Sequence, residues 1–234
     1  MKKIYKIFII ILVSYAAVSA IMLFLSYYDF QISIDKQIKN NKNVVVIKPV
    51  FTSMAYSLNG FYKYYFHKCD TSCLTVKFTE KSVNQYNIAY NGIVMLSYLD
   101  YHVISDIDVD RNPGILNNYT TVIVMHNEYA TQKEFDAITN HSKVIYLYPN
   151  SLYGKIETNY NNDTITLIRG HGYPNSNLTN GFNWKLDDTN FESTICTNSN
   201  WKFIKIENGY MLNCYPEKII KTNHKLLEQI QKLS

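Results

Sequence analysis

Residues 120–154 read T-T-V-I-V-M-H-N-E-Y-A-T-Q-K-E-F-D-A-I-T-N-H-S-K-V-I-Y-L-Y-P-N-S-L-Y-G and decide the fold. Residues 122–125 are apolar at every position, which is typical of a central strand in a parallel sheet, because such a strand is buried on both faces. Thr131 and Glu134 have the spacing of a capping box, which predicts that a helix begins here. A second apolar run at residues 144–147 predicts the next strand. Strand, helix and strand in this order predict a right-handed βαβ unit with helices on both faces of a parallel sheet.

The rest of the chain extends this pattern in both directions. Short apolar or alternating runs predict further strands, and helical spacing predicts the helices between them. The strands are expected over residues 44–47, 74–78 and 101–109, and the helices over residues 55–66, 86–98 and 113–119. In the third of these strands, Asp106, Asp108 and Asp110 would lie on one face, because side chains alternate along a strand.

After residue 154 the sequence predicts antiparallel structure. Strands are expected over residues 155–160 and 164–168, followed by a hairpin around Asn208-Gly209. A terminal helix is predicted to begin at Pro216. The predicted fold class is therefore α/β: a parallel sheet with helices on both faces, a C-terminal antiparallel β extension and a terminal helix.

Composition is that of a globular protein. Of the 234 residues, 47% are hydrophobic and 18% are charged, and the formal net charge is +4. No linker or repeat divides residues 44–234, so we expect a single domain there. The basic residues form no compact patch interleaved with aromatic residues, and we therefore expect no nucleic-acid partner.

The N-terminus has the composition of a membrane anchor. Residues 7–28 are uncharged and follow Lys2, Lys3 and Lys6. A run of about 20 apolar residues spans a bilayer as a helix, and a cationic flank stays in the cytoplasm. We predict a signal anchor over residues 1–28, a spacer over residues 29–43, and a single-pass protein of the cell membrane whose domain is extracytoplasmic.

A cleaved signal peptide is the alternative, because Val18-Ser19-Ala20 has small residues where cleavage needs them. Both interpretations place the domain outside the cytoplasm. The four cysteines agree with that compartment, since an even number in an exported domain indicates disulfides. Local pairing, Cys69 with Cys73 and Cys196 with Cys214, is the simplest of three connectivities. Possible N-glycosylation sequons begin at Asn118, Asn140, Asn162 and Asn177.

Polar residues follow the strand at 122–125 directly. His126 and Glu128 can move protons or bind a metal, and the carboxyl ends of parallel strands are where open α/β sheets bind ligands. The structural alternative is that Glu128 accepts backbone N–H groups near the next helix. His171, in R-G-H-G-Y-P, is a second candidate because its glycine neighbours let the backbone approach a ligand closely.

We therefore expect one crevice with His126, Glu128 and His171 as catalytic candidates. Ligand-binding candidates are the residues expected beside them at strand ends and in loops. These are Phe51, Thr52, Asn127, Tyr129, Asn150, Tyr153 and Arg169.

The motif H-x-E-Y-x-T, followed by E-F-D-A, an apolar strand and P-N-S-L-Y, resembles the dimethylformamidase large-subunit-like group. That group belongs to the class I glutamine-amidotransferase-like superfamily of flavodoxin-type folds. The resemblance covers residues 122–154. This chain departs from the family pattern at Ala130 and Gly154, where the family has tryptophan, and at Pro149, where it has glycine.

The resemblance implies an amidohydrolase whose iron is held by tyrosine and glutamate side chains. Of those ligands it identifies only Glu128 by motif. A cysteine nucleophile is not expected, because no cysteine lies at a strand-to-helix elbow, and Ser151 is not in G-x-S-x-G.

Three functions follow as hypotheses. The first is a degenerate amidotransferase-like domain, without enzymatic activity or a required cofactor, that binds a small ligand or a surface protein in the crevice. The second is a metal-assisted hydrolase of C–N (amide) bonds that uses Glu128 with His126 or His171. The third is a structural cell-surface protein whose tyrosine-rich face packs on its neighbours.

Overall fold

The computed structural model describes most of the chain, namely residues 11–27, 43–79, 89–184, 191 and 193–234. The chain divides into two compact units, Met1–Asn40 and Asn41–Ser234. In the first unit, residues 11–27 form a helix. Within the described residues, no helix combines the length and the hydropathy that crossing a membrane requires. Parts of the predicted anchor and nearly all of the predicted spacer, residues 1–10 and 28–42, lie outside the described residues.

The second unit is built on a six-stranded sheet in the order β3-β1-β4-β6-β10-β9. All neighbouring pairs are parallel except β9 with β10, which form the predicted hairpin. In chain order, the parallel strands are arranged 2-1-3-4-5, which is the doubly wound order of flavodoxin-type sheets. The strands are β1 (Val44–Lys48), β3 (His102–Ser105), β4 (Thr121–Val124), β6 (Val144–Tyr146), β9 (Phe203–Ile206) and β10 (Gly209–Leu212).

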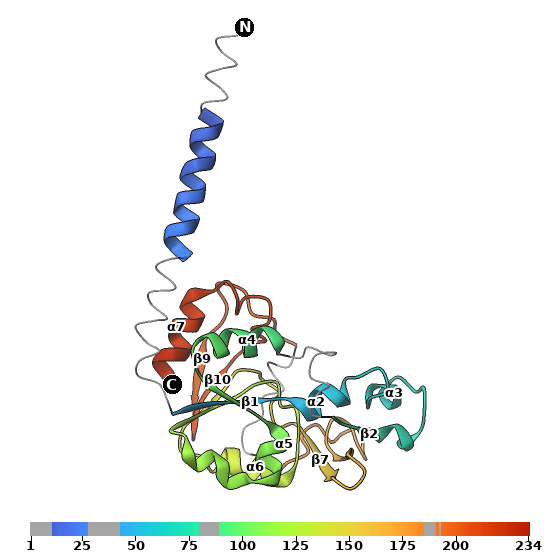
Figure 1. Cartoon of the computed structure of the whole chain (residues 1–234). Helices are drawn as coiled ribbons and strands as arrows, with labels where there is room; N and C mark the ends of the chain where they lie inside the picture. The colour runs from blue at the N-terminus through green and yellow to red at the C-terminus, as the bar shows by residue number, and fades with distance from the viewer. Residues whose placement is uncertain (1–10, 28–42, 80–88, 185–190, 192) are drawn as a thin grey trace. The chain divides into compact units, whose positions relative to one another are not determined.

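Helices cover both faces of this sheet, as Figure 1 shows, which confirms the predicted fold class. The first face carries α4 (Tyr90–Tyr98) and α7 (His224–Leu233). The second carries α5 (Asp106–Arg111), the 3-10 helix η3 (Pro113–Asn118) and α6 (Gln132–Thr139). The central strands are buried along their length, because each has a helical layer on either side.

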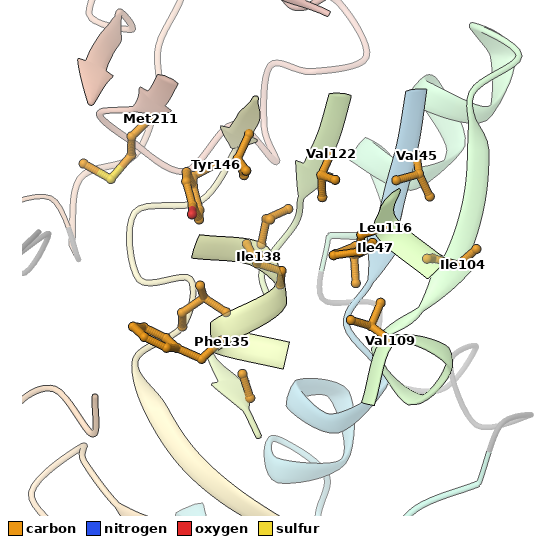
Figure 2. Packing of buried hydrophobic residues seen from close by; sticks show 14 of the residues in the cluster. Val45, Ile47, Ile104, Val109, Leu116, Val122, Phe135, Ile138, Tyr146 and Met211 are labelled. Carbon is orange, nitrogen blue, oxygen red and sulfur yellow. The ribbon is translucent and has the colours of Figure 1, made fainter. Parts of the chain in front are cut away.

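The core between the sheet and the second helical layer is apolar and closely packed (Figure 2). Side chains that alternate along the strands, such as Val45 and Val122, meet Leu116 of η3 and Ile138 of α6. The predicted capping box starts α6: the Thr131 hydroxyl accepts from the Glu134 N–H, and the Glu134 carboxylate accepts from the Thr131 N–H.

A second sheet with the order β2-β8-β7-β5 lies beyond one end of the first. Strands β7 and β8 are antiparallel, as predicted, while β5 is parallel to β7. Short helices connect this sheet to the end of β1. The elements are α2 (Val50–Ala55), α3 (Tyr62–Tyr65), the 3-10 helix η1 (Thr71–Leu74), β2 (Thr75–Lys77), β5 (Tyr129–Ala130), β7 (Gly154–Asn159) and β8 (Thr164–Arg169).

The strand predicted over residues 101–109 is wrong in its second half. It ends at Ser105, whose side chain forms a capping box with Asp108 and starts α5. Asp106 and Asp110 are therefore four residues apart on one helical face and are buried, while Asp108 is exposed. A spacing of four puts two residues on the same side of either a helix or a strand, so the alternating pattern did not separate the two.

The helix predicted over residues 55–66 is wrong over most of its length, because α2 already ends at Ala55 and only the four residues of α3 are helical after it. Gly60 lies between them, where an added Cβ would be 2.0 Å from the Ala55 carbonyl oxygen. The terminal helix begins at His224 and not at Pro216, and Asn223 caps it by accepting from the Leu226 N–H.

Both predicted disulfides are present, Cys69–Cys73 and Cys196–Cys214. The second joins the segment before β9 to the segment after β10, and both of its cysteines are buried. The four asparagines that begin sequons are all exposed.

Candidate functional site

The site lies where the strand order of the main sheet reverses. Strands β1 and β4 are neighbours, and the chain leaves their carboxyl ends toward α2 and toward residues 125–128. Crevices at such switch points are the usual ligand sites of open α/β sheets.

Glu128 occupies the centre of this site and is completely buried. Its Oε2 accepts a hydrogen bond from the Tyr56 hydroxyl at 2.5 Å and another from Asn150 Nδ2 at 3.0 Å. Its backbone carbonyl accepts from the N–H groups of Tyr153 and Gly154, both at 2.8 Å. The segment after α2 and the loop after β6 therefore fix both the backbone and the carboxylate of Glu128.

The two predicted histidines reach the same carboxylate from different parts of the chain. His126 Nε2 is 3.5 Å from Glu128 Oε2, and His171 Nδ1 is 3.7 Å from Glu128 Oε1. The His126 ring stacks on Tyr148 with an interplanar angle of 8°. His171 follows β8 in a turn where it and both flanking glycines have positive φ, so the turn depends on glycine at those two positions. The structure thus brings His126, Glu128 and His171 together.

Tyrosines complete the site, and sequence reasoning missed their role. Tyr56 and Tyr62 are not among the predicted site residues, yet Tyr56 bonds Glu128, and the Tyr62 hydroxyl lies 3.4 Å from His171 Nε2. Burial raises the pKa of Tyr56 well above its usual range, and the nearby negative charge of Glu128 adds to the increase. Burial, again with the Glu128 charge, also raises the pKa of Tyr65. Both phenols are therefore protonated at neutral pH, and that of Tyr56 donates its proton to Glu128.

The sequence did contain one indication of the role of these tyrosines, which is that they follow shortly after the end of β1. Residues that follow the end of a central parallel strand are expected near the crevice, and Tyr56 is the residue directly after α2.

Several buried polar atoms at this site have no hydrogen-bond partner within the described part of the chain. They are His126 Nε2, Asn127 Nδ2, Glu128 Oε1 and Asn150 Oδ1. Each such atom costs about 1–3 kcal/mol when it is buried without a partner. Buried polar atoms in native proteins are nearly always satisfied, so a group of four is typical of a place where water, an ion or a ligand supplies the missing bonds.

The other predicted ligand-binding residues have different environments. Phe51 packs in the core, and its N–H donates to Asp106 Oδ2. The Thr52 hydroxyl accepts from the Tyr129 N–H, which ties α2 to β5. Tyr153 is buried with its ring centroid 5.8 Å from that of His171. Arg169 ends β8 and is partly exposed.

A metal could be held only with help from tyrosine. Among the residues that the structure describes, no three histidine, cysteine, aspartate or glutamate side chains are arranged around one metal position. His126 and His171 approach different oxygens of Glu128. Tyr56 adds an oxygen in contact with the same carboxylate, and if a metal displaced its proton, the Tyr56 phenolate with Glu128 and His126 would form a donor set of the kind that iron accepts. The residues present thus fit the metal that the resemblance implies.

The arrangement can also transfer protons without a metal. A buried carboxylate between two imidazoles can accept a proton, and an imidazole can donate one near neutral pH. A cysteine nucleophile is not available, because all four cysteines are in disulfides.

No protein-family model matches this chain, and no curated protein matches it in sequence.

Proposed function

We propose that residues 44–234 form an extracytoplasmic domain that binds a small polar ligand at Glu128. The observation that carries this proposal is the group of buried, unpartnered polar atoms at the switch point of the sheet. A purely structural ion-pair network would satisfy its members, because an unsatisfied one costs stability. The half-satisfied carboxylate of Glu128 is therefore best explained as one side of a binding site.

The unpartnered atoms suggest the chemistry of the ligand. Glu128 Oε1 and Asn150 Oδ1 can only accept hydrogen bonds, whereas Asn127 Nδ2 can only donate them. A ligand that offers N–H groups together with a carbonyl oxygen matches both requirements. Small amides have this combination, and the resemblance of residues 122–154 to the dimethylformamidase-like group points to the same class.

Hydrolysis of the bound amide is the second candidate function. The specific observation in its favour is that both oxygens of Glu128 lie within 3.7 Å of an imidazole. Glu128 would take a proton from the attacking water, and His171 or His126 would give a proton to the leaving nitrogen. Glu128 and Tyr56, with His126, are the residues that would hold iron. When bound, a metal supplies Lewis-acid polarisation of the carbonyl and a lowered pKa for water.

The extracytoplasmic location is part of the proposal. Its support is the pair of disulfides, which form and persist in oxidising compartments. Anchorage through residues 7–28 stays a prediction from composition, as does the cytoplasmic position of the N-terminus.

A thermal-shift experiment on the full-length chain tests the binding proposal. Formamide, acetamide, their N-methyl derivatives and Fe(III) are added in turn to three proteins: the wild type, Glu128→Gln and Glu157→Gln. Glu157 is an exposed residue of β7 and serves as the matched control. A ligand at 100 times its Kd stabilises the native state by about 2.7 kcal/mol. We expect stabilisation in the wild type and in Glu157→Gln, and its loss in Glu128→Gln.

Equal stabilisation of Glu128→Gln would overturn the proposal, as would the absence of a shift with every compound. The enzyme hypothesis has its own readout, which is release of the amine from an amide that binds. Binding without release would leave the ligand-binding function and contradict hydrolysis.

A further inference from the structure

A cavity of about 570 Å³ shares no lining residue with the Glu128 site. Its volume falls within the range of roughly 300–1,000 Å³ that is typical of small-molecule sites. It lies between the end of α6, the segment before residue 185 and the β9–β10 turn. The lining residues are Phe135, Thr139, Asn140, Asn183, Trp184, Lys205, Ile206, Glu207 and Asn208.

Trp184 gives this cavity an aromatic wall in a fixed orientation. Its ring meets Phe135 edge to face, with centroids 5.8 Å apart, and is tilted against Tyr146 at 5.5 Å. Phe135 is held in turn by parallel stacking on Phe182 at 4.3 Å. Figure 2 shows Phe135 and Tyr146 within the packed core, so the indole rests on rigid side chains. Trp184 itself is only partly buried.

The rest of the lining is polar and nearly uncharged. Three asparagines and a threonine contribute amide and hydroxyl groups. The Asn208 amide N–H groups and the Thr139 hydroxyl already donate to backbone carbonyls, so Asn140 and Asn183 are the amides on which a ligand would depend most. The only charged side chains in the lining, Lys205 and Glu207, have opposite signs, and both are exposed. A ligand with a net charge would therefore gain little from this cavity.

From this combination we infer that the Trp184 cavity is a binding site for a neutral pyranose sugar. One face of a pyranose ring presents C–H groups that pack on an aromatic ring, and its hydroxyls both donate and accept hydrogen bonds. Amide side chains also donate and accept, so asparagines around a tryptophan match both aspects of a sugar. This inference goes beyond the proposed function and does not depend on it.

Tryptophan fluorescence gives a direct test, because the chain has only two tryptophans. In the full-length Trp201→Phe variant, Trp184 is the only tryptophan left to emit. Glucose, galactose, mannose and N-acetylglucosamine are titrated into this variant, made in a host that does not glycosylate it, with glycerol as the solvent control. We expect a saturable change in emission for at least one sugar, with a Kd of roughly 0.1–10 mM.

Two variants show whether the response comes from the cavity. In Trp184→Phe, which keeps an aromatic ring against Phe135, Trp201 is the sole reporter and no saturable change is expected. Asn183→Ala alters an exposed polar residue of the lining, so the fold is retained, and we expect it to weaken binding at least about five-fold. No saturable change with any of the four sugars, an equal response to glycerol, or a response retained in Trp184→Phe would overturn the inference.

The sugar in this cavity could be either a free sugar or part of a glycan attached to this chain. Asn140 is part of the lining and begins a sequon, so an N-linked glycan would start at the cavity rim. The titration is repeated on Trp201→Phe protein made in a glycosylating host, with and without Asn140→Gln. A response that is lost in the glycosylated protein and restored by Asn140→Gln identifies the attached glycan as the occupant. An equal response in both proteins identifies a free sugar.

Discussion

Glu128 is a completely buried carboxylate whose ion-pair partners in the described part of the chain are two histidines. Residues kept for binding are often not optimal for stability. We therefore predict that Glu128→Gln, which removes the buried charge and keeps the shape, folds normally. Its free energy of unfolding should equal that of the wild type or exceed it by about 1 kcal/mol. Chemical denaturation measures this difference, with Glu157→Gln as the control for an exposed glutamate.

A loss of about 3–5 kcal/mol in Glu128→Gln would contradict this prediction, because that is the cost of breaking a buried ion pair. Such a result would make Glu128 a structural residue and weaken the binding proposal as well.

Tyr56 donates the shortest hydrogen bond to Glu128. Tyr56→Phe keeps the ring, which packs on Tyr62, but removes that donor. A hydrogen bond to a charged group contributes about 1.5–3 kcal/mol, and we predict a loss of this size in the free energy of unfolding. Tyr64→Phe, in the same tyrosine-rich segment, is the matched control and should have a smaller effect.

This prediction includes a pH dependence. Because the folded-state pKa of Tyr56 is raised, the stabilisation that it gives is fully present below the unfolded pKa near 10 and is lost only at higher pH. The effect of Tyr56→Phe should therefore be constant between pH 6 and about 9. A steep change within that range would mean that another group controls the bond.

At the scale of elements, some sequence patterns predicted helices and strands correctly and others did not. The β-branched runs of β1 and β4 were recognised because burial on both faces leaves a continuous apolar stretch. The box of Thr131 and Glu134 located α6 within one residue. The same signal, serine followed three residues later by aspartate, was present at Ser105 and would have corrected the strand that became α5.

Only those site residues that come directly after a strand could be predicted from the sequence. His126 and Glu128 come directly after β4, and their place at the crevice follows from parallel-sheet geometry. The contact of Tyr56 with Glu128 depends on where α2 ends and on the break at Gly60, which are results of tertiary packing. No local pattern encodes them.

The helices α5 and α6 also bring together carboxylates that are buried. Glu134 and Asp106 are fully buried and Asp110 nearly so. Burial raises the pKa of Glu134 well above its usual value, and the charges of Asp106 and Asp110 raise it further. Burial likewise raises the pKa of Asp106, although three backbone N–H groups and Lys48 act in the opposite direction.

A raised carboxyl pKa makes the fold less stable as pH increases. The contribution of Glu134 to stability is fully present below the unfolded pKa of 4.5 and is lost as pH rises through the higher folded pKa. We predict that Glu134→Gln, which can still close the capping box with Thr131, is more stable than the wild type at pH 8 by roughly 1–2 kcal/mol and not more stable at pH 4. Denaturant unfolding across this pH range measures the difference.

Asp136→Asn is the matched control, since Asp136 is an exposed acid on the same helix. It should show no comparable increase at pH 8. An equal gain from Glu134→Gln at both pH values would contradict the titration of Glu134 as its cause.

At the scale of the whole domain, the two disulfides constrain very different lengths of chain. Cys196–Cys214 spans 18 residues and ties both ends of the β9–β10 hairpin, whereas Cys69–Cys73 spans only four. In the chain-entropy model, stabilisation grows with the closed loop, to about 3 kcal/mol for the longer and about 2 kcal/mol for the shorter. Because Cys196 and Cys214 are buried, replacing both with alanine also removes core contacts, so the loss should exceed 3 kcal/mol by about 1 kcal/mol or more.

The two disulfides should also differ in how easily they are reduced, because they differ in exposure to solvent. Cys69 and Cys73 are partly exposed, and a reducing agent reaches exposed sulfur first. With increasing dithiothreitol under native conditions, we expect mass spectrometry after alkylation to find Cys69 and Cys73 labelled while Cys196 and Cys214 are still paired. The hairpin brings β10 into the main sheet beside β6, so its disulfide should open only together with the sheet. Release of the buried bond at a dithiothreitol concentration that leaves the domain folded would show that the hairpin opens independently of the parallel sheet.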